Sequence, residues 1–301
     1  MTKLFQLLAS GAALGAVYAL VGLGFVVIYR ATGVINFAQA GMVVLGAFLV
    51  YNAAATWDLP FWLSVVVSMG IGAVIGILLE RVILRQMIGQ PVYAVILVTV
   101  GLLLLVEPIV TTIWRNPATN IENPWGLSRL TIGDVRILQV DVATVALAAI
   151  VLGIFFAFFR FTKYGVAMRA TAIDQEAALA QGIEVRRVVA LSWAIAGMVA
   201  VLAGAMLGSG AGPGVGLGVG MGIVSLKALP AVVLGGLDSP LGAVVGGLII
   251  GIAEVLTAGY QADVVPFLPR GFAGVMPWVV MIVVLLVRPY GLFGTRDVRR
   301  I

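Results

Sequence analysis

Long apolar runs, separated by short polar segments, make up most of this chain of 301 residues. An apolar run of about 20 residues is long enough to cross the hydrocarbon core of a bilayer as a helix. The runs predict membrane-spanning helices at 5–29, 35–55, 61–79, 92–114, 141–159, 189–209, 223–237, 241–258 and 272–287. Because two of these runs are short for a perpendicular helix, we expect about 8–10 transmembrane helices. The predicted fold is an all-α polytopic membrane helix bundle with broken or re-entrant elements.

Composition supports an integral membrane protein with a single transmembrane domain over residues 1–301. Hydrophobic residues make up 62% of the chain and charged residues only 10%, against about 25% charged in soluble domains. The net charge of +5 does not indicate nucleic-acid binding, because the basic residues lie at the ends of apolar runs and no basic patch is interleaved with aromatics. The partner that this pattern implies is the lipid bilayer.

Missing residue types exclude several kinds of chemistry. The chain has no Cys and no His, which rules out disulfides, thiolate or imidazole metal sites, and catalysis by Cys or His. Its three lysines, Lys3, Lys163 and Lys227, do not follow the glycine pattern of a Walker A loop. We see no carboxylate pair at acid–base spacing and no nucleophile motif. We therefore expect no enzymatic site and no bound cofactor or metal, and any ATPase must be a separate chain.

A polar segment at 160–187 lies between two predicted spans. Its apolar positions recur every three or four residues and predict a short helix with one thin apolar stripe, formed by Val166, Ala170, Ile173, Ala177 and Ala180. Gly165 opens this segment, and Gly182 stands where the helix is expected to end. A stripe made mostly of alanine is a poor core but a fair docking surface. Our interpretation is a loop through which a partner outside the membrane moves the helices inside it.

Basic residues predict the orientation of the chain. If 160–187 is cytoplasmic and the number of crossings is odd, most Lys and Arg residues fall on the cytoplasmic side. The N-terminus is then outside and the C-terminus inside. The longest segment on the outer side, 115–141, contains Trp125 and the strand-like run DVRILQV. It is either a structured cap or part of a docking surface for an outside partner.

Glycines follow a pattern in the predicted spans. Small residues spaced by four let helix backbones approach closely, and they occur at Gly11/Gly15, Gly72/Gly76, Gly242/Gly246, Gly247/Gly251 and Ala200/Gly204/Gly208. The run 208–222 is too rich in glycine for a regular lipid-facing helix. Irregular backbone at membrane depth is tolerated where it is buried in protein or lines a wet cavity. This run is therefore predicted to be a broken or re-entrant element.

Two interrupted apolar segments indicate a substrate pathway. The first is the glycine-rich run, and the second lies near Thr32, Asn36 and Gln39. The candidate pathway residues are Asn36, Gln39, Gly212, Gly214, Gly216 and Gly218. For Asn36 and Gln39, hydrogen bonding to neighbouring helices is an equally good interpretation.

Ionisable residues inside predicted spans are Glu107, Lys227 and Glu254. Such groups either form structural pairs or mark ion and substrate pathways. A stand-alone secondary transporter would use Glu107 and Glu254 as proton or sodium sites, so an ion-coupled transporter is an alternative hypothesis.

Five blocks of the sequence resemble the branched-chain amino-acid permease family of ABC importers, of the LivH type. They are GAVYALVGLGFVVIYRATGVINFAQAG, ERVILR, KYGVAMRATAIDQEAALAQGI, KALPAVVLGGLDSPLGAVVGGLIIGIAE and LLVRPYGLFG. They occur in the family's order over the whole chain. Members of this family also move urea, short amides or other amino acids, and these blocks belong to the shared framework.

The resemblance implies a permease subunit in a bacterial cytoplasmic (inner) membrane. Its implied partners are a second homologous permease, cytoplasmic ATPases that use ATP, and an extracytoplasmic substrate-binding protein. It also implies that Gly165–Gly182 is the coupling loop that contacts an ATPase. The residues expected to carry this coupling are Arg169, Ala170, Ile173, Asp174, Glu176, Ala177 and Gly182, with Asp174 and Glu176 as polar contacts.

Overall fold

The computed structural model describes residues 2–87, 89–114, 120–211, 216–218, 220–264 and 271–294. Its 7 long apolar helices each have the length and composition to cross a membrane. They are α1 (Thr2–Thr32), α2 (Ala38–Ala55), α3 (Phe61–Val82), α4 (Val92–Trp114), α5 (Gln139–Phe161), α8 (Val185–Gly208) and α11 (Pro240–Val264). The 3-10 turn η1 (Leu84–Met87) continues α3.

Shorter elements complete the described fold. They are α6 (Lys163–Ile173), α7 (Gln175–Ala180), α9 (Met221–Leu226), α10 (Ala228–Gly235), η2 (Phe272–Val275) and α12 (Met276–Val287). The stretches Met221–Gly235 and Phe272–Val287 are apolar as well. Together with the long helices, they coincide with the apolar runs of the sequence, although only the 7 long helices have the length to cross a membrane. The prediction of an all-α polytopic bundle is confirmed.

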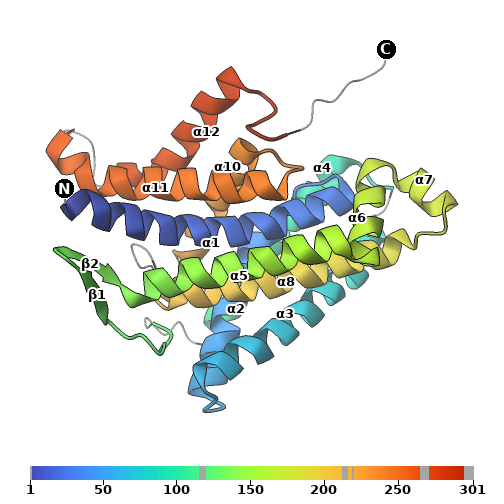
Figure 1. The fold of residues 1–301 in the computed structure, drawn as a ribbon. Helices are drawn as coiled ribbons and strands as arrows, with labels where there is room; N and C mark the ends of the chain where they lie inside the picture. Colours follow the sequence, from blue (N-terminus) through green and yellow to red (C-terminus); the bar gives the residue numbers. More distant parts are fainter. Residues whose placement is uncertain are drawn as a thin grey trace.

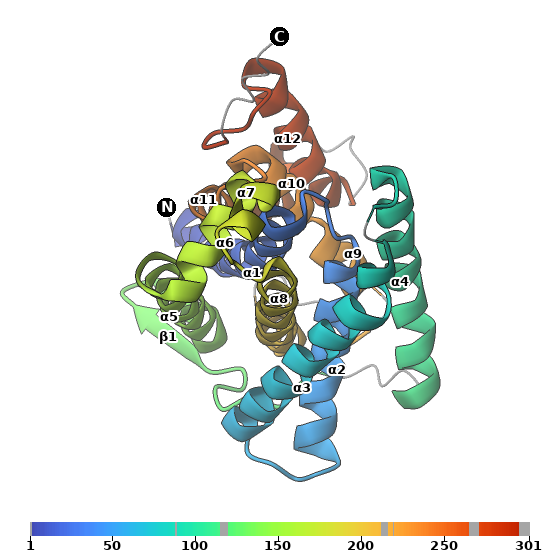
Figure 2. The same ribbon diagram turned by 90° about the vertical axis from the view of Figure 1, so that its right-hand side faces the viewer.

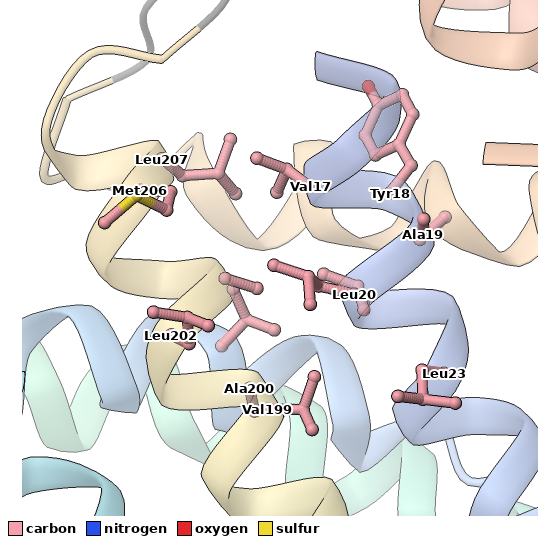
Figure 3. Close-up of a cluster of buried hydrophobic side chains, with 14 of the residues drawn as sticks. Val17, Tyr18, Ala19, Leu20, Leu23, Val199, Ala200, Leu202, Met206 and Leu207 are labelled. Carbon is pink, nitrogen blue, oxygen red and sulfur yellow. The ribbon is translucent and has the colours of Figure 1, made fainter. Parts of the chain in front are cut away.

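Helix α1 forms the centre of the bundle. Of the residues in its most apolar 18-residue stretch, 94% are buried. It packs against α11, α8 and α5 (Figure 1). In the core, Val17 of α1 and Leu207 of α8 point toward each other, while Tyr18 points away from α8 (Figure 3). In helix α4, only 11% of the corresponding stretch is buried. This helix lies at the edge of the bundle beside α2 (Figure 2).

The bundle has two distinct ends (Figure 1). The hairpin end carries the start of α1 and the antiparallel strands β1 (Arg129–Ile132) and β2 (Val135–Leu138). The elbow end carries α6 and α7, and Gln175 of α7 donates a hydrogen bond of 3.0 Å to the carbonyl of Ala31 near the end of α1. Segment 288–294, which follows α12, bonds to the end of α10. The predicted strand-like run is confirmed in part, because its last two residues begin α5 instead.

Close helix seams form where the sequence predicted them. A Cβ added at Gly251 of α11 would lie 2.3 Å from the backbone nitrogen of Gly15 on α1. A Cβ added at Gly76 of α3 would lie 2.2 Å from the carbonyl oxygen of Trp193 on α8. No side chain fits at such distances, so these glycines allow direct backbone contact between helices.

The glycine-rich run 208–222 breaks the regular structure as predicted. Helix α8 ends at Gly208, the chain turns at Gly210 with φ of +85°, and α9 begins at Met221. A further break at Lys227 separates α9 from α10.

Candidate functional site

Helices α6 and α7 form an elbow that local side chains define at each end. The Thr162 hydroxyl accepts a hydrogen bond of 3.0 Å from the backbone N–H of Gly165 and so caps α6. The Asp174 carboxylate accepts bonds of 2.9 and 3.0 Å from the N–H groups of Glu176 and Ala177 and caps α7. Gly182 ends α7 with φ of +79°, as predicted.

The single helix predicted across this segment is wrong. Asp174 adopts an extended conformation, with φ of −156° and ψ of 111°, and divides the segment into α6 and α7. The reason is that an Asp side chain satisfies free N–H groups at a helix start better than it tolerates a helix interior. The predicted stripe is therefore not one continuous face, although Ile173 at the bend is 87% exposed and Ala177 is exposed too. The buried residues of the elbow are Gly165, Met168, Thr171 and Ala178.

Contacts to α1 and α5 anchor the elbow to the bundle. The Arg169 guanidinium donates a hydrogen bond to the carbonyl of Phe159 on α5 and lies 5.3 Å from the centre of that ring. Gln175 holds the end of α1 as described above. Half-buried Ala170 adjoins these contacts, whereas Asp174 and Glu176 are exposed. The coupling role of these residues stays a prediction.

A cavity of about 730 Å³ opens at the elbow end, between the end of α1, the segment 34–36, the end of α3, the start of α4, α7 and α8. We call it the large cavity. Its polar lining includes Asn36, Thr99, Gln175 and the ion pair in which Arg85 donates to Glu80 at 2.8 and 3.1 Å. This pair was not expected from the sequence, although an acidic and a basic residue five positions apart in ERVILR offered a signal.

The polar residues Asn36 and Gln39 have different environments at the start of α2. Asn36 lines the large cavity, and its side-chain oxygen accepts a bond of 3.1 Å from the N–H of Ala38. Gln39 is fully buried, donates a bond of 3.2 Å to the carbonyl of Ala196 on α8, and fills the space left by Gly24 of α1. The Gln39 side-chain oxygen is buried and has no hydrogen-bond partner among the described residues, so both interpretations of Gln39 stay predictions.

A second, small cavity of about 30 Å³ lies between α2, α4 and the glycine-rich run. Gly218, Gly222 and the exposed side chain of Glu107 line it, together with apolar residues such as Val44 and Phe48. Gly216 has φ of +61° in the same run. The candidates Gly212 and Gly214 lie outside the described residues.

The two cavities follow one another along the seam between α2 and α4. On α4, Thr99 lines the large cavity and Leu103 lines the small one, a separation of about 6 Å along the helix axis. Asn36, which lies just before α2, lines the first, and Gly41 of α2 lines the second. Asn36 and Gly218 therefore line separate cavities, whereas Gln39 contacts α8.

Lys227 and Glu254 form an ion pair of 2.5 Å within the bundle. The Tyr18 hydroxyl donates a bond of 2.7 Å to the other carboxylate oxygen of Glu254. A structural pair was one interpretation for each of Lys227 and Glu254, without a named partner. Tyr18 has no signal in an apolar run that would mark it as a partner of Glu254. Glu107 is not part of this cluster.

Comparison with known proteins identifies the family. Residues 7–285 match the sequence profile of the family described as "Branched-chain amino acid transport system / permease component". The chain belongs to this permease family. Two relatives align with this chain over most of their length. The permease has the long apolar helices of a multi-pass membrane protein.

The first relative is the high-affinity branched-chain amino acid transport system permease protein LivH of Salmonella typhimurium. It is 31% identical over 98% of this chain and 97% of its own. The second, a probable branched-chain amino acid transport permease protein LivH of Methanocaldococcus jannaschii, is 26% identical over 91% and 88%. A solved structure of PsaBC from Streptococcus pneumoniae in complex with Fab aligns with 96% of this chain and 93% of that chain, at a TM-score of 0.48 and 16% identity.

Proposed function

We propose that this permease is one membrane subunit of an ATP-driven ABC importer that moves branched-chain amino acids into the cell. The family and the names of the relatives support the transport class and the cargo. The observation that carries the mechanism is the elbow, which exposes Ile173 and is bonded to the ends of α1 and α5. A short helical element with these two properties can receive a push and pass it to the bundle.

Transport proceeds by alternating access. A binding protein docks at the hairpin end and releases its cargo at the α2–α4 seam. Closure of the ATPases displaces the elbow, and the bond between Gln175 and Ala31 transmits the movement to α1. Because Gln175 and Leu179 of α7 also line the large cavity, the same displacement changes the wall of the pathway.

A second permease covers the exposed face of α4. Glu107 is exposed on this face, about 10 Å from the helix end at Trp114. A charged side chain at that depth is unfavourable in contact with lipid and usually faces protein or a water-filled cavity. The small cavity is too small for an amino acid, which supports a pathway completed by the second permease.

The remaining partners follow from composition and orientation. Without a Walker A loop in the sequence, ATP hydrolysis takes place in a separate cytoplasmic chain, and this permease binds no cofactor itself. The elbow end faces the cytoplasm, because basic residues gather there among the described residues: Arg30, Arg160, Lys163, Arg169, Arg186 and Arg187. The N-terminus then lies outside the cytoplasmic membrane and the C-terminus inside.

Glu254 argues for an importer over an ion-coupled transporter. Its carboxylate is already bonded to Lys227 and Tyr18, which satisfies the charge without a bound ion. A related cargo such as urea, a short amide or another amino acid would be carried by the same machine.

Substitutions at the elbow test the proposal. The permease is purified from native membranes with its partners and reconstituted in liposomes, and leucine uptake and ATP hydrolysis are measured together. Ile173→Asp and Ala177→Arg change exposed side chains, so the protein should insert normally but lose most of the uptake per ATP. Ile173→Leu keeps the apolar surface and serves as the matched control. Unchanged uptake in both charged variants would remove the elbow from the mechanism.

A further inference from the structure

We propose that the joint between α5 and α6 binds the head group of an anionic phospholipid through the side chains of Arg160 and Lys163. The joint is the segment from Arg160 to Tyr164, which ends α5, passes through Thr162 and begins α6. This inference goes beyond the proposed function and takes from it only the position of the second permease beside α4. It adds a lipid ligand and the residues that bind it.

Helix α5 presents an apolar face outward along its length. Only 22% of its most apolar 18-residue stretch is buried. Its exposed large side chains include Val142, Val145, Ile150 and Ile154. Helix α4, the proposed contact of the second permease, lies at the opposite edge of the bundle (Figure 2). That partner therefore leaves the outer face of α5 to the lipid.

The joint lies where this apolar face ends. Phe161 follows Ile154 by seven residues, so it lies on the same face of the helix, about 10 Å further along the axis. Phe161 is 77% exposed and Tyr164 is 50% exposed. Aromatic rings and basic side chains at the end of a membrane-spanning helix are typical of the head-group region of a bilayer. The joint is therefore at the depth of the lipid phosphates.

The two basic side chains of the joint have no acidic partner. Arg160 and Lys163 are exposed, and neither forms an ion pair among the residues that the structure describes. The Arg160 guanidinium lies 5.6 Å from the centre of the Phe161 ring. The Lys163 ammonium lies 5.5 Å from the centre of the Tyr164 ring. Each cation is thus held beside an exposed ring and remains accessible to an anion.

Positive charge is not balanced along this part of the chain. No Asp or Glu occurs in the stretch 142–173, which contains Arg160, Lys163 and Arg169. The next acidic residue, Asp174, lies at the far end of α6, about 16 Å from Lys163 along the helix axis. Arg169 is already bonded to the end of α5. The complementary ligand for the joint is therefore an anion.

A phospholipid with a net negative charge matches both properties of the joint. Its phosphate accepts charge-assisted hydrogen bonds from Arg160 and Lys163, and its acyl chains cover the apolar face of α5. Phosphatidylcholine carries the same phosphate, but its choline group cancels the charge. Each basic residue near an anionic surface contributes about 5-fold in affinity. The bound head group contacts both sides of the joint and so holds α6, the base of the elbow, against the end of α5.

The test is site-specific photocrosslinking of the permease, purified with its partners, in nanodiscs. Tyr164 is replaced by p-benzoylphenylalanine, and the nanodiscs contain phosphatidylglycerol and phosphatidylcholine in equal amounts. The lipid attached at position 164 is identified by mass spectrometry of the peptide. We expect phosphatidylglycerol adducts to exceed phosphatidylcholine adducts by about 5-fold or more. The same label at Val142, an exposed residue near the other end of α5, should give equal amounts of the two adducts.

A charge-removing variant identifies the residues that select the lipid. Arg160→Gln with Lys163→Gln keeps two polar side chains but removes both charges, so the preference for phosphatidylglycerol at position 164 should disappear. Arg129→Gln with Arg136→Gln is the matched control, because both arginines are exposed on the hairpin at the other end of the bundle. It removes the same charge and should leave the preference unchanged.

Several results would overturn the inference. They are equal adducts of the two lipids at position 164, the same preference at Val142, a preference that persists in the Arg160→Gln and Lys163→Gln variant, or crosslinks chiefly to a protein chain. The lipid comparison keeps both basic residues, so it holds even if the double variant does not fold. Crosslinking needs neither ATP nor cargo, whereas the proposed function is tested by leucine uptake, so failure of one is distinguishable from failure of the other.

Discussion

Removing the carboxylate of Glu254 should destabilise the bundle strongly. Glu254→Gln keeps the size of the side chain but leaves the Lys227 ammonium without the partner that lies 2.5 Å away. The two side chains are only 9% and 13% exposed, so water replaces little of the lost interaction. The Tyr18 hydroxyl also loses its charged acceptor.

The magnitude follows from the burial of this pair. Removing one partner of a buried ion pair costs about 3–5 kcal/mol, because the other charge remains uncompensated. At about 2–4 °C per kcal/mol for a chain of this size, the unfolding midpoint should fall by on the order of 10 °C. Tyr18→Phe removes one hydrogen bond to a charged group and should cost less, about 1.5–3 kcal/mol.

The assay is thermal unfolding of the detergent-purified permease. After heating to each temperature, the fraction that still elutes as a folded, monodisperse species is measured. The double variant Lys227→Met with Glu254→Gln contains no unpaired charge and should recover most of the lost stability. Lys3 and Asp263 provide a matched control, since they pair at 2.6 Å but are 52% and 61% exposed. Asp263→Asn should therefore change stability by only about 0–1 kcal/mol.

Two results would refute this reasoning. The first is a Glu254→Gln variant no less stable than Asp263→Asn, which would mean that the pair is hydrated. The second is a double variant as unstable as the single one, which would mean that the unpaired Lys227 charge is not the cause.

The remaining predictions concern packing and the elbow. Gly76→Ala should disrupt the α3–α8 seam, because its Cβ would lie 2.2 Å from the Trp193 carbonyl oxygen, and the unfolding midpoint should fall. Gly70→Ala in the same helix meets open space and should be neutral or stabilising by up to about 1 kcal/mol; equal effects of the two would refute the seam. Asp174→Ala should lose the α7 cap, about 1 kcal/mol locally, and reduce uptake per ATP. Asp174→Asn keeps a capping oxygen, so a loss of coupling there indicates that the ATPase contacts the charge, and normal coupling assigns Asp174 to capping alone.

Much of the fold could be predicted from local sequence alone. The length of the apolar runs located the 7 long helices. A helix that crosses a bilayer depends on such a run alone and not on contacts with residues far away in the sequence. Gly182 marked the end of the elbow, because a left-handed conformation there depends on the residue itself. The break at Asp174 was missed, since apolar spacing is the same for one helix and for two short ones in line. The signal available in the sequence was Asp174 itself, because Asp is favoured at the start of a helix.

The candidate site was predictable only in part. Asn36 and Gly218 were expected to share a pathway; they line two separate cavities, and the pathway stays a prediction. Gln39 resembles Asn36 in sequence, yet it bonds to α8 instead of lining a described cavity.

The sequence by itself determined the spans, the broken segments, the close glycine seams and the membrane class of this protein. The tertiary structure alone decided which faces meet. The central helices α1 and α2 are apolar on every side, so periodicity does not indicate which side is buried against a neighbour. Tyr18 and Glu254 are brought together across 236 positions. In a medium of low polarity, such pairings depend on the geometry of the packed helices, and no local pattern specifies them.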